Sequence, residues 1–416
     1  MNRSVVRRIR QLGTFDVENY GDLLYPIVFE QLLATPIDRY SLLPGEAPLQ
    51  AGFQTESITS LLSSQTPEPL TLVIGGGDLL RTDADIIARH YGRNSRTSYD
   101  TLRKSIGLSG YAGYLLRDKL PRLEPSGFYA RNFRARWMNY SALGPFVVEP
   151  QHLPHGSDVA YVSCGVPHEF SSVEADEVKR AFDRACHIWV RDEASAEKLR
   201  RAGVSQTLHV AADAAVMLSQ LFRREDLAER GQRILSPLGI PTDGPLLCFQ
   251  TQPYPGFSEE EILTQLNRYR ETHGGEVVLL PLGYCHGDHE FLRRLSQKSH
   301  GVLKYADAGS VADMLAIIAA SDLFAGTSLH GNITAFSFGI PHLFGPLPVA
   351  KVEGFLNVAN LPAELKLQSW RELNDKIDFA LELGRQFFTE RAREAKAVVE
   401  REVDQLRHDL LKCTGA

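Results

Sequence analysis

The second half of the chain alternates short apolar runs with segments whose apolar residues recur at helical spacing. Residues 245–250 predict a buried strand, and a helix follows from Ser258, which with Glu261 three residues later has the pattern of a capping box. The alternation continues to residue 344, with strands over 277–282, 302–305, 322–325 and 341–344 and helices over 288–297, 310–320 and 328–338. Repeated strand–helix–strand units indicate a parallel sheet covered by helices, which is a Rossmann-like lobe.

The first half shows the same alternation with an interruption. Strands are predicted over 70–74, 161–164 and 188–191, and the apolar residues between 178 and 186 recur at the spacing of a one-sided helix. The polar, proline-containing segment 225–244 predicts a linker. We therefore expect an α/β protein with a first lobe over 1–225, a second over 244–370 and charged helices over 371–416.

A basic and aromatic segment interrupts the first lobe. Between residues 89 and 140 eleven Lys or Arg side chains face only three acidic ones, and nine aromatic residues lie among them. We expect a helical insert over about 89–150 that could hold an anionic, sugar-bearing or lipid-linked acceptor, with Arg131 and Arg134 among its contacts. The alternative is a helical insert whose charges only face water.

Composition limits the classes of function. The chain has 45 basic and 51 acidic residues, for a net charge of −6, which argues against a dedicated nucleic-acid binder. Any anionic ligand must then be held by a local positive site. The five cysteines have no paired spacing, and no apolar run follows the arginines of residues 1–13. With no stretch of about 18 apolar residues either, we expect a cytoplasmic protein without a transmembrane segment.

The segment 322–343 carries the most informative candidate residues. A predicted strand ends at Ala325, Thr327 or Ser328 begins the next helix, and His330 lies in its first turn. Ligands of open parallel sheets bind at the carboxyl ends of strands, where helix N-termini expose free N–H groups. His330 is therefore a candidate to bind an anion or donate a proton, with a buried structural histidine as the alternative. Gly331 would let a ligand approach the backbone.

Two glycine-containing loops of the first half are further candidates. Asn19 and Asp22 lie on a strand-to-helix loop, where Asp22 could act as a base, position an acceptor hydroxyl or simply cap the helix. Gly76, Gly77 and Asp78 follow a predicted strand, where the glycines allow close approach of a ligand or only a tight turn. No GK[ST] sequence follows them, which excludes a P-loop.

A third loop, residues 285–289, has side chains of the kind that bind metals. A structural zinc site needs four ligands at fitted spacing, so we expect no metal here and predict that His286 and Asp288 line the cleft. Glu364 and Glu372 have the spacing of the nucleotide-sugar motif of some glycosyltransferases, which chance also explains.

Several motifs, in order, resemble the polysaccharide pyruvyl transferase family. They are N-Y-G-D at 19–22, G-G-G-D-L-L at 75–80, W-V-R-D at 189–192, T-S-L-H-G at 327–331, S-F-G-I-P at 337–341 and K-V-E-G-F at 351–355. The resemblance implies two Rossmann-like lobes in a GT-B-like arrangement with the active site in the cleft. It also implies transfer of a pyruvyl group from phosphoenolpyruvate to two hydroxyls of a saccharide, forming a ketal and releasing phosphate.

The resemblance assigns roles to the candidate residues. His330 corresponds to the general acid, and Arg191 would grip an oxyanion with two parallel hydrogen bonds. The implied donor-binding set also contains Thr327, Ser328, Gly331, His286 and Gln250. The implied acceptor-binding set is Asn19, Gly76, Gly77, Asp78, Arg131 and Arg134. Phosphoenolpyruvate is a substrate, so no cofactor is expected, and the partner is a saccharide, free or lipid-linked, rather than a nucleic acid.

Two positions depart from the family pattern. Ser328 and Gln250 stand where many members have arginine, so two positive charges are missing. Two alternatives therefore stay open. The chain could be a GT-B glycosyltransferase that uses a sugar nucleotide, or a saccharide-binding relative without catalytic activity.

Overall fold

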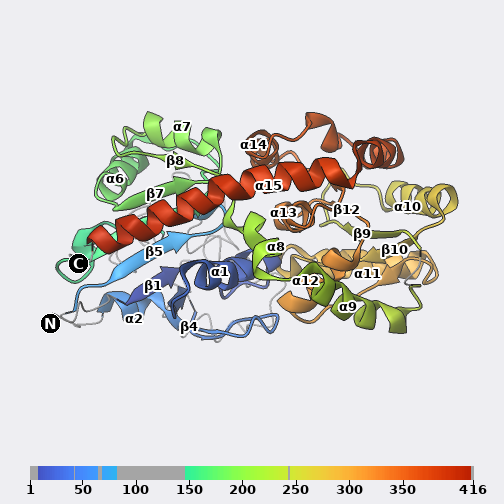
Figure 1. The fold of residues 1–416 in the computed structure, drawn as a ribbon, viewed down its shortest axis with the longest axis horizontal. Helices are drawn as coiled ribbons and strands as arrows, with labels where there is room; N and C mark the ends of the chain where they lie inside the picture. The colour runs from blue at the N-terminus through green and yellow to red at the C-terminus, as the bar shows by residue number, and fades with distance from the viewer. Residues whose placement is uncertain (1–7, 42, 64–67, 82–145, 242–243, 414–416) are drawn as a thin grey trace, which may run out of the picture.

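The computed structural model describes residues 8–41, 43–63, 68–81, 146–241 and 244–413, and it contains two sheets side by side (Figure 1). The first sheet has the order β3-β4-β2-β1-β5-β6-β7-β8, and only the β3–β4 pair is antiparallel. Its strands are β1 (Ile9–Leu12), β2 (Asp38–Ser41), β3 (Gly45–Glu46), β4 (Gln54–Ser57), β5 (Thr71–Gly75), β6 (Asp158–Cys164), β7 (His187–Val190) and β8 (His209–Val210).

The second sheet is entirely parallel and has the order β11-β10-β9-β12-β13. Its strands are β9 (Leu246–Gln250), β10 (Glu276–Leu279), β11 (Lys304–Tyr305), β12 (Leu323–Gly326) and β13 (His342–Phe344). The strand order reverses between β9 and β12, so the loops after these two strands diverge and leave a crevice at their carboxyl ends. The predicted Rossmann-like lobe is confirmed, and His330 follows one of the two strands that border the crevice.

Helices cover both sheets. They are α1 (Tyr20–Leu33), α2 (Ile58–Ser63), α6 (Ser172–Phe182), α7 (Glu193–Arg201), α8 (Leu218–Leu221), α9 (Arg224–Leu235), α10 (Glu259–His273), α11 (Asp288–Lys298), α12 (Val311–Ala320), α13 (Leu329–Ser337), α14 (Ala350–Val358) and α15 (Leu373–Cys413). Ser258 caps α10 as predicted, since its hydroxyl accepts the N–H of Glu261. Side chains of Asp192 and Ser328 cap α7 and α13 in the same way.

The segment that the sequence analysis assigns to a linker, residues 225–244, contains most of α9. This helix packs against α12 of the second lobe, where Gly231 lies against the Ala316 carbonyl. The Arg224 guanidinium donates to the carbonyls of Ala319 and Ser321. The linker prediction is therefore corrected: α9 is a packed helix of the second lobe, and its apolar residues are too few to stand out from the charged ones.

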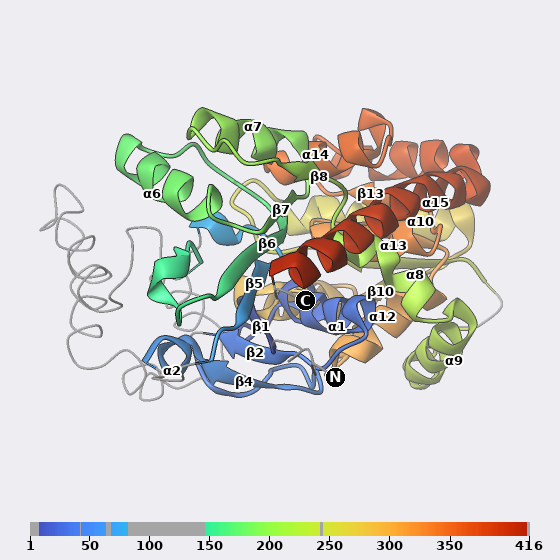
Figure 2. The ribbon, with the colours of Figure 1, turned by 60° about the vertical axis from the view of Figure 1, so that its left-hand side comes forward.

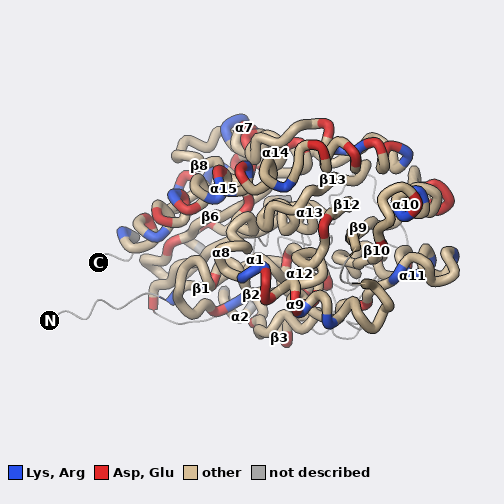
Figure 3. The backbone as a smooth tube through the Cα atoms, turned by 45° about the vertical axis from the view of Figure 1, so that its right-hand side comes forward, with Lys and Arg blue, Asp and Glu red and all other residues tan. Residues whose placement is uncertain are grey.

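The last helix connects the two lobes. α15 begins beside the second sheet and runs back across the first, bending at Gly384, whose φ is 75° (Figures 1 and 2). Charged residues of both signs follow one another along it (Figure 3). Toward its end, an Asp409 carboxylate oxygen lies 3.0 Å from His187 Nδ1, and Glu402 lies between His187 and His209, 3.0 and 3.1 Å from their nearest nitrogens. This ion-pair cluster fastens α15 to β7 and β8.

The cluster on β7 and β8 also has side chains of the kind that bind metal ions. The ligand atoms of His187, His209 and Glu402 lie within 4.8 Å of one another. The imidazole rings of His187 and His209 stack at 4.7 Å with an angle of 25° between their planes.

The predicted basic insert falls largely outside the description. Arg131 and Arg134 lie outside the described residues, while Phe146, Val147 and Val148, at the end of the predicted insert, are buried in the first lobe. None of the described helices combines the length and the apolar character needed to cross a bilayer.

Candidate active site

The site is built around the start of α13. The Ser328 side chain accepts the Gly331 N–H at 3.2 Å, which caps the helix and fixes His330 in its first turn. The His330 side chain is only 14% exposed. Its imidazole therefore lies at the positive end of a helix in a largely desolvated position, where electrostatic interactions are strong.

Asp213 is the partner of His330. Its Oδ2 lies 3.5 Å from His330 Nε2, while its Oδ1 accepts the Ala215 N–H at 3.0 Å at the start of the short helix η4 (Ala214–Met217). Burial by itself would raise the pKa of Asp213, but His330 and Arg191 outweigh burial and lower it. Asp213 is therefore ionised near neutral pH and can orient the imidazole. The sequence analysis missed it, although its position just after β8 is itself a signal.

Gly21 brings the N-Y-G-D motif of the first lobe against His330. A Cβ built on Gly21 would lie 2.1 Å from His330 Nδ1, so only glycine leaves room for the ring. One residue earlier, the Tyr20 hydroxyl lies 2.9 Å from the Thr334 hydroxyl on α13. The Asn19 amide donates to Asp22 at 2.8 Å, and Asp22 lies close to the turn at Gly77. Residues 20–22 form the first turn of α1 instead of the predicted loop, and together with Asn19 they meet the turn at 75–78 beside α13.

A second group of charges surrounds Arg191, just after β7. The buried Arg191 forms an ion pair with the partly exposed Asp78, and its Nε lies 3.9 Å from Asp192. Lys351 on α14 of the other lobe lies 3.8 Å from Asp78. Burial would raise the pKa of Asp78, but Arg191, Lys351 and His330 together lower it.

Two glycines make room for this group. A Cβ on Gly165 would lie 2.6 Å from both the Arg191 guanidinium and the Asp78 carboxylate. A Cβ on Gly354 would lie 2.9 Å from the Asp192 side chain. The K-V-E-G-F motif of α14 therefore supplies both a cation and a close contact between the lobes, and the first lobe's motifs supply the carboxylates.

The basic side chains of this group are already paired with carboxylates of the protein. Arg191 and Lys351 both lie within 4 Å of Asp78, and His330 lies 3.5 Å from Asp213. The carboxylates are Asp78, Asp192 and Asp213. An anionic substrate must therefore compete with these carboxylates for the cations.

Gln250 holds the loop before His330 in place. Its Nε2 donates to Asp288 at 2.6 Å, and its Oε1 accepts the Ser328 N–H at 2.7 Å and the Thr327 hydroxyl at 3.3 Å. Both ends of the amide are thus used inside the protein, and Thr327 is drawn into the same network. Gln250 is 2% exposed and Thr327 6%. The two residues position the start of α13 and are turned away from open solvent.

Asp288 is the buried carboxyl beneath this network. The N–H groups of Leu282 and Gly283 also donate to it, yet burial dominates and raises its pKa to about 7. A neutral glutamine at position 250 supplies no charge that would offset burial, as an arginine at this position would. Near neutral pH the carboxyl is therefore divided between its two protonation states.

The remaining predicted residues have other surroundings. Gly331 is a packing position, because a Cβ there would lie 2.5 Å from the Phe324 ring, and Gly76 lies in the same way against Tyr25. His286 lies exposed on a short helical turn after β10. The structure thus brings together His330, Arg191, Asp78, Asp22 and Asn19, while His286 lies at the surface.

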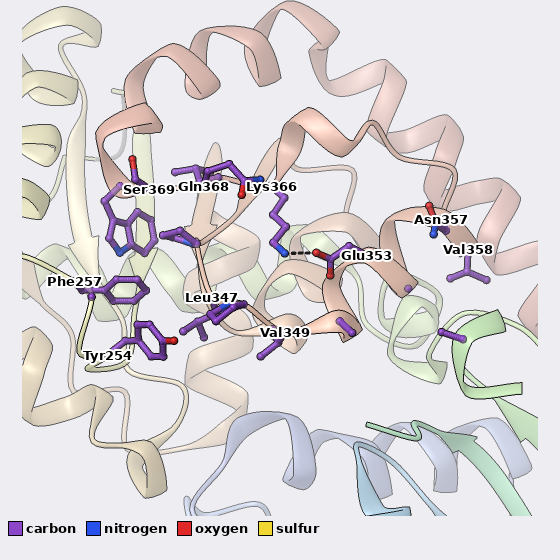
Figure 4. A pocket seen from close by; sticks show the side chains of 18 of the residues that line it. Tyr254, Phe257, Leu347, Val349, Glu353, Asn357, Val358, Lys366, Gln368 and Ser369 are labelled. Carbon is purple, nitrogen blue, oxygen red and sulfur yellow. Dashed lines mark hydrogen bonds and ion pairs between the residues drawn. The ribbon is translucent and has the colours of Figure 1, made fainter. Parts of the chain in front are cut away.

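A large cavity opens between the lobes beside Arg191 and Lys351 (Figure 4). Its volume is about 990 Å³, and its walls come from the start of α7, the loop after β9, the loop after β13, α14 and residues 366–370. Glu193 and Ala194 on its wall directly follow Arg191 and Asp192, and Glu353 and Gly354 follow Lys351. His330 is not among the described residues that line it.

Comparison with known proteins supports the family and the fold. The family model described as polysaccharide pyruvyl transferase matches residues 146–344. No curated protein matches the sequence. UDP-GlcNAc 2-epimerase from Neisseria meningitidis, solved bound to UDP-GlcNAc, is 12% identical, with a TM-score of 0.52 over 98% of this chain and 100% of that one. The Anabaena protein HepE, solved with UDP and glucose, is 13% identical with a TM-score of 0.49 over 98% and 97%.

A wall teichoic acid polymerase, TagF, is 11% identical and has a TM-score of 0.48 over 98% of this chain and 89% of that one. At these identities the likeness concerns the fold. The predicted pair of Rossmann-like lobes in a GT-B-like arrangement is confirmed, and the family pattern together with this fold identifies a transferase.

We expect Gly21→Ala to reduce turnover strongly, by about tenfold or more, because the added methyl group would occupy the position of the His330 ring. Thermal unfolding and turnover should be measured on the same preparation. Gly244→Ala is the control, since a Cβ at this position meets nothing within 4 Å and the backbone there is not left-handed. Unchanged turnover in Gly21→Ala would show that the position of the imidazole is not critical.

We expect Asp288→Asn to change how stability depends on pH. In the wild type the folded-state pKa of about 7 lies above the unfolded value, so stability is lost as pH rises from about 4 to 7. The asparagine cannot ionise, so the thermal midpoint of the variant relative to the wild type should be higher at pH 8 than at pH 5. Equal differences at both values would contradict the raised pKa.

Proposed function

Since the chain carries the polysaccharide pyruvyl transferase pattern over residues 146–344, we propose that it transfers a pyruvyl group from phosphoenolpyruvate to two hydroxyls of a saccharide. The observation that carries the proposal is the pairing of His330 with Asp213 at the N-terminus of α13, against Gly21 of the other lobe. This pairing provides an oriented acid between the two lobes, as the reaction requires.

The proposed chemistry needs a proton donor for carbon. The first sugar hydroxyl adds to C2 of phosphoenolpyruvate while His330 gives a proton to the methylene carbon, which becomes a methyl group. The second hydroxyl then bonds to C2 as the bond to the phosphate oxygen breaks. One hydroxyl proton replaces the proton that His330 gave, and the other leaves with phosphate, so a ketal and inorganic phosphate result.

Asp213 and Asp22 have supporting roles in this proposal. The Asp213 carboxylate stabilises the charged imidazolium while it waits to give up its proton, because it is ionised and 3.5 Å away. Asp22, held by the Asn19 amide and one residue from Gly21, is the base that receives a proton from a sugar hydroxyl. The acid that acts on the donor and the base that acts on the acceptor then come from opposite lobes.

Arg191 and Lys351 are the cations for the donor. Both are paired with Asp78, so the carboxylate or phosphate of phosphoenolpyruvate would take the place of Asp78 when it binds. Ser328 and Gln250 add no positive charge to the site. Arg191, Lys351 and the start of α13 are therefore the groups available to the donor. We therefore expect weaker donor binding than two additional arginines would give.

Replacing His330 tests the proposal directly. We expect His330→Gln to lower phosphate release from phosphoenolpyruvate and acceptor by about 10²–10⁴-fold, because the methylene carbon loses its acid. Phosphate release is measured with circular dichroism as the check on folding. His300→Gln, which changes a histidine at an exposed turn, is the control. A His330→Gln enzyme that is as fast as the wild type would eliminate the mechanism.

Asp78→Asn tests the competition between the donor and the protein's own carboxylate. We expect a lower KM for phosphoenolpyruvate, by several-fold, because the neutral amide holds Arg191 and Lys351 less strongly. Asp176→Asn on the exposed side of α6 is the control. A raised donor KM would mean that Asp78 orients the cations instead of competing for them.

A thermal-shift measurement on the wild-type protein addresses the alternative function. A higher unfolding temperature with UDP but not with phosphoenolpyruvate would favour a glycosyltransferase that uses a sugar nucleotide.

A further inference from the structure

The cavity between the lobes has an aromatic wall. Tyr254 and Phe257 lie on one side of it, with ring centroids 5.2 Å apart, and Phe257 lies edge-on to Trp370 at 5.8 Å (Figure 4). Tyr254 is 38% exposed, so its ring is accessible to a ligand in the cavity. Such rings present flat apolar faces, and the C–H faces of pyranose rings pack well against them.

The polar groups of the same cavity offer both donors and acceptors. Lys366 is ion-paired with Glu353 across the cavity, and Asn357, Gln368 and Ser369 add two amides and a hydroxyl (Figure 4). Hydroxyl groups of a sugar both donate and accept, so mixed groups of this kind suit them. A neutral ligand can use them without displacing an ion pair.

The charges around the cavity argue against a nucleotide. Lys366 is the one cation among the lining residues that the structure describes, and Glu353 neutralises it. The other charged lining residues, Glu193 and Glu261, are acidic. Both are ion-paired, Glu193 with Arg200 and Glu261 with Arg371. A diphosphate would therefore have to displace a carboxylate from a cation before it could bind one. The lining selects for a neutral ligand.

The cavity borders the candidate active site. Glu193 and Glu353 on its wall follow Arg191 and Lys351 by two residues, so the segments that carry the charged group also form part of the cavity. Its volume of about 990 Å³ lies at the upper end of the ~300–1,000 Å³ range of small-molecule sites, far more than phosphoenolpyruvate needs. The space suits a saccharide of more than one ring.

We propose that this cavity binds neutral sugar units of the acceptor that lie next to the sugar being modified. That these units lie next to the sugar being modified rests on the proposed function. That the cavity binds a saccharide at all can be tested without any reaction. Tyr254 and Phe257 would pack against a ring face, and Gln368 and Asn357 would bind hydroxyls. The cavity would then select acceptors by the sugars around the reacting unit.

The experiment uses the full-length protein, fluorescently labelled, on an array of neutral bacterial oligosaccharides with UDP and pyrophosphate as competitors. We expect retention on a subset of neutral glycans, with about tenfold weaker binding for Tyr254→Ala, which is ~1.4 kcal/mol. Asn357→Ala on the opposite wall should weaken binding to the same glycans. Leu381→Ala, an exposed apolar residue of α15 outside the cavity, should bind as the wild type does.

Three outcomes would overturn the inference: no retention on any neutral glycan, equal retention of Tyr254→Ala and the wild type, or displacement by UDP. The array result is independent of the chemistry, and His330→Gln should be retained as the wild type is. Glycan binding without any pyruvyl transfer would therefore reject the proposed function and keep the cavity assignment. Pyruvyl transfer with the same acceptor KM in Tyr254→Ala and the wild type would reject the cavity assignment alone.

Discussion

The ion pair between Arg191 and Asp78 is the interaction on which the arrangement of the site depends. The two residues follow β7 and β5, and Lys351 reaches them from the other lobe, so one carboxylate joins two strand ends and α14. Arg191 is 5% exposed and Asp78 30%, so solvent screens this pair less than it screens an ion pair on the surface. The glycines at 165 and 354 are explained by the same pair, because side chains there would separate its members or the lobes.

Because its cations are paired with carboxylates, the site differs from a cleft lined by unpaired positive charges. A strongly positive cleft would attract any phosphate-bearing metabolite, whereas paired cations favour a ligand that can replace a carboxylate in the correct geometry. Positions 250 and 328 have no arginine and so add no further positive charge. The Gln250 amide joins Asp288 to the start of α13, so this residue holds the site's structure in place and does not contribute a charge to it.

Local patterns predicted the second sheet and the strands β5, β6 and β7 of the first, while β1 to β4 and β8 were not predicted. Each of the strands β5, β6, β7, β9 and β12 contains an unbroken run of at least three apolar residues. Ser258 and Asp192 cap helices by contacts within three residues, which a sequence displays directly. The motifs also located His330 and Arg191. What they could not show depends on distant partners. Asp213 acquires its role from a histidine 117 residues later, and Gln250 from Asp288, 38 residues away. α9 was missed because its packing surface consists of Leu227, Gly231 and Leu235 among charges.

α15 has a consequence for how the two lobes can move. It is held to the second lobe at its beginning and to β7 and β8 near its end, so a single helix spans the boundary between the lobes. Gly384 bends the helix within the second lobe, because Phe388 and Lys396 beyond it still contact His342 and Ser337 of that lobe. The stretch from Lys396 to Glu402 that crosses between the lobes is uninterrupted helix, so a change in the width of the cleft would have to bend this stretch or release one of its two ends.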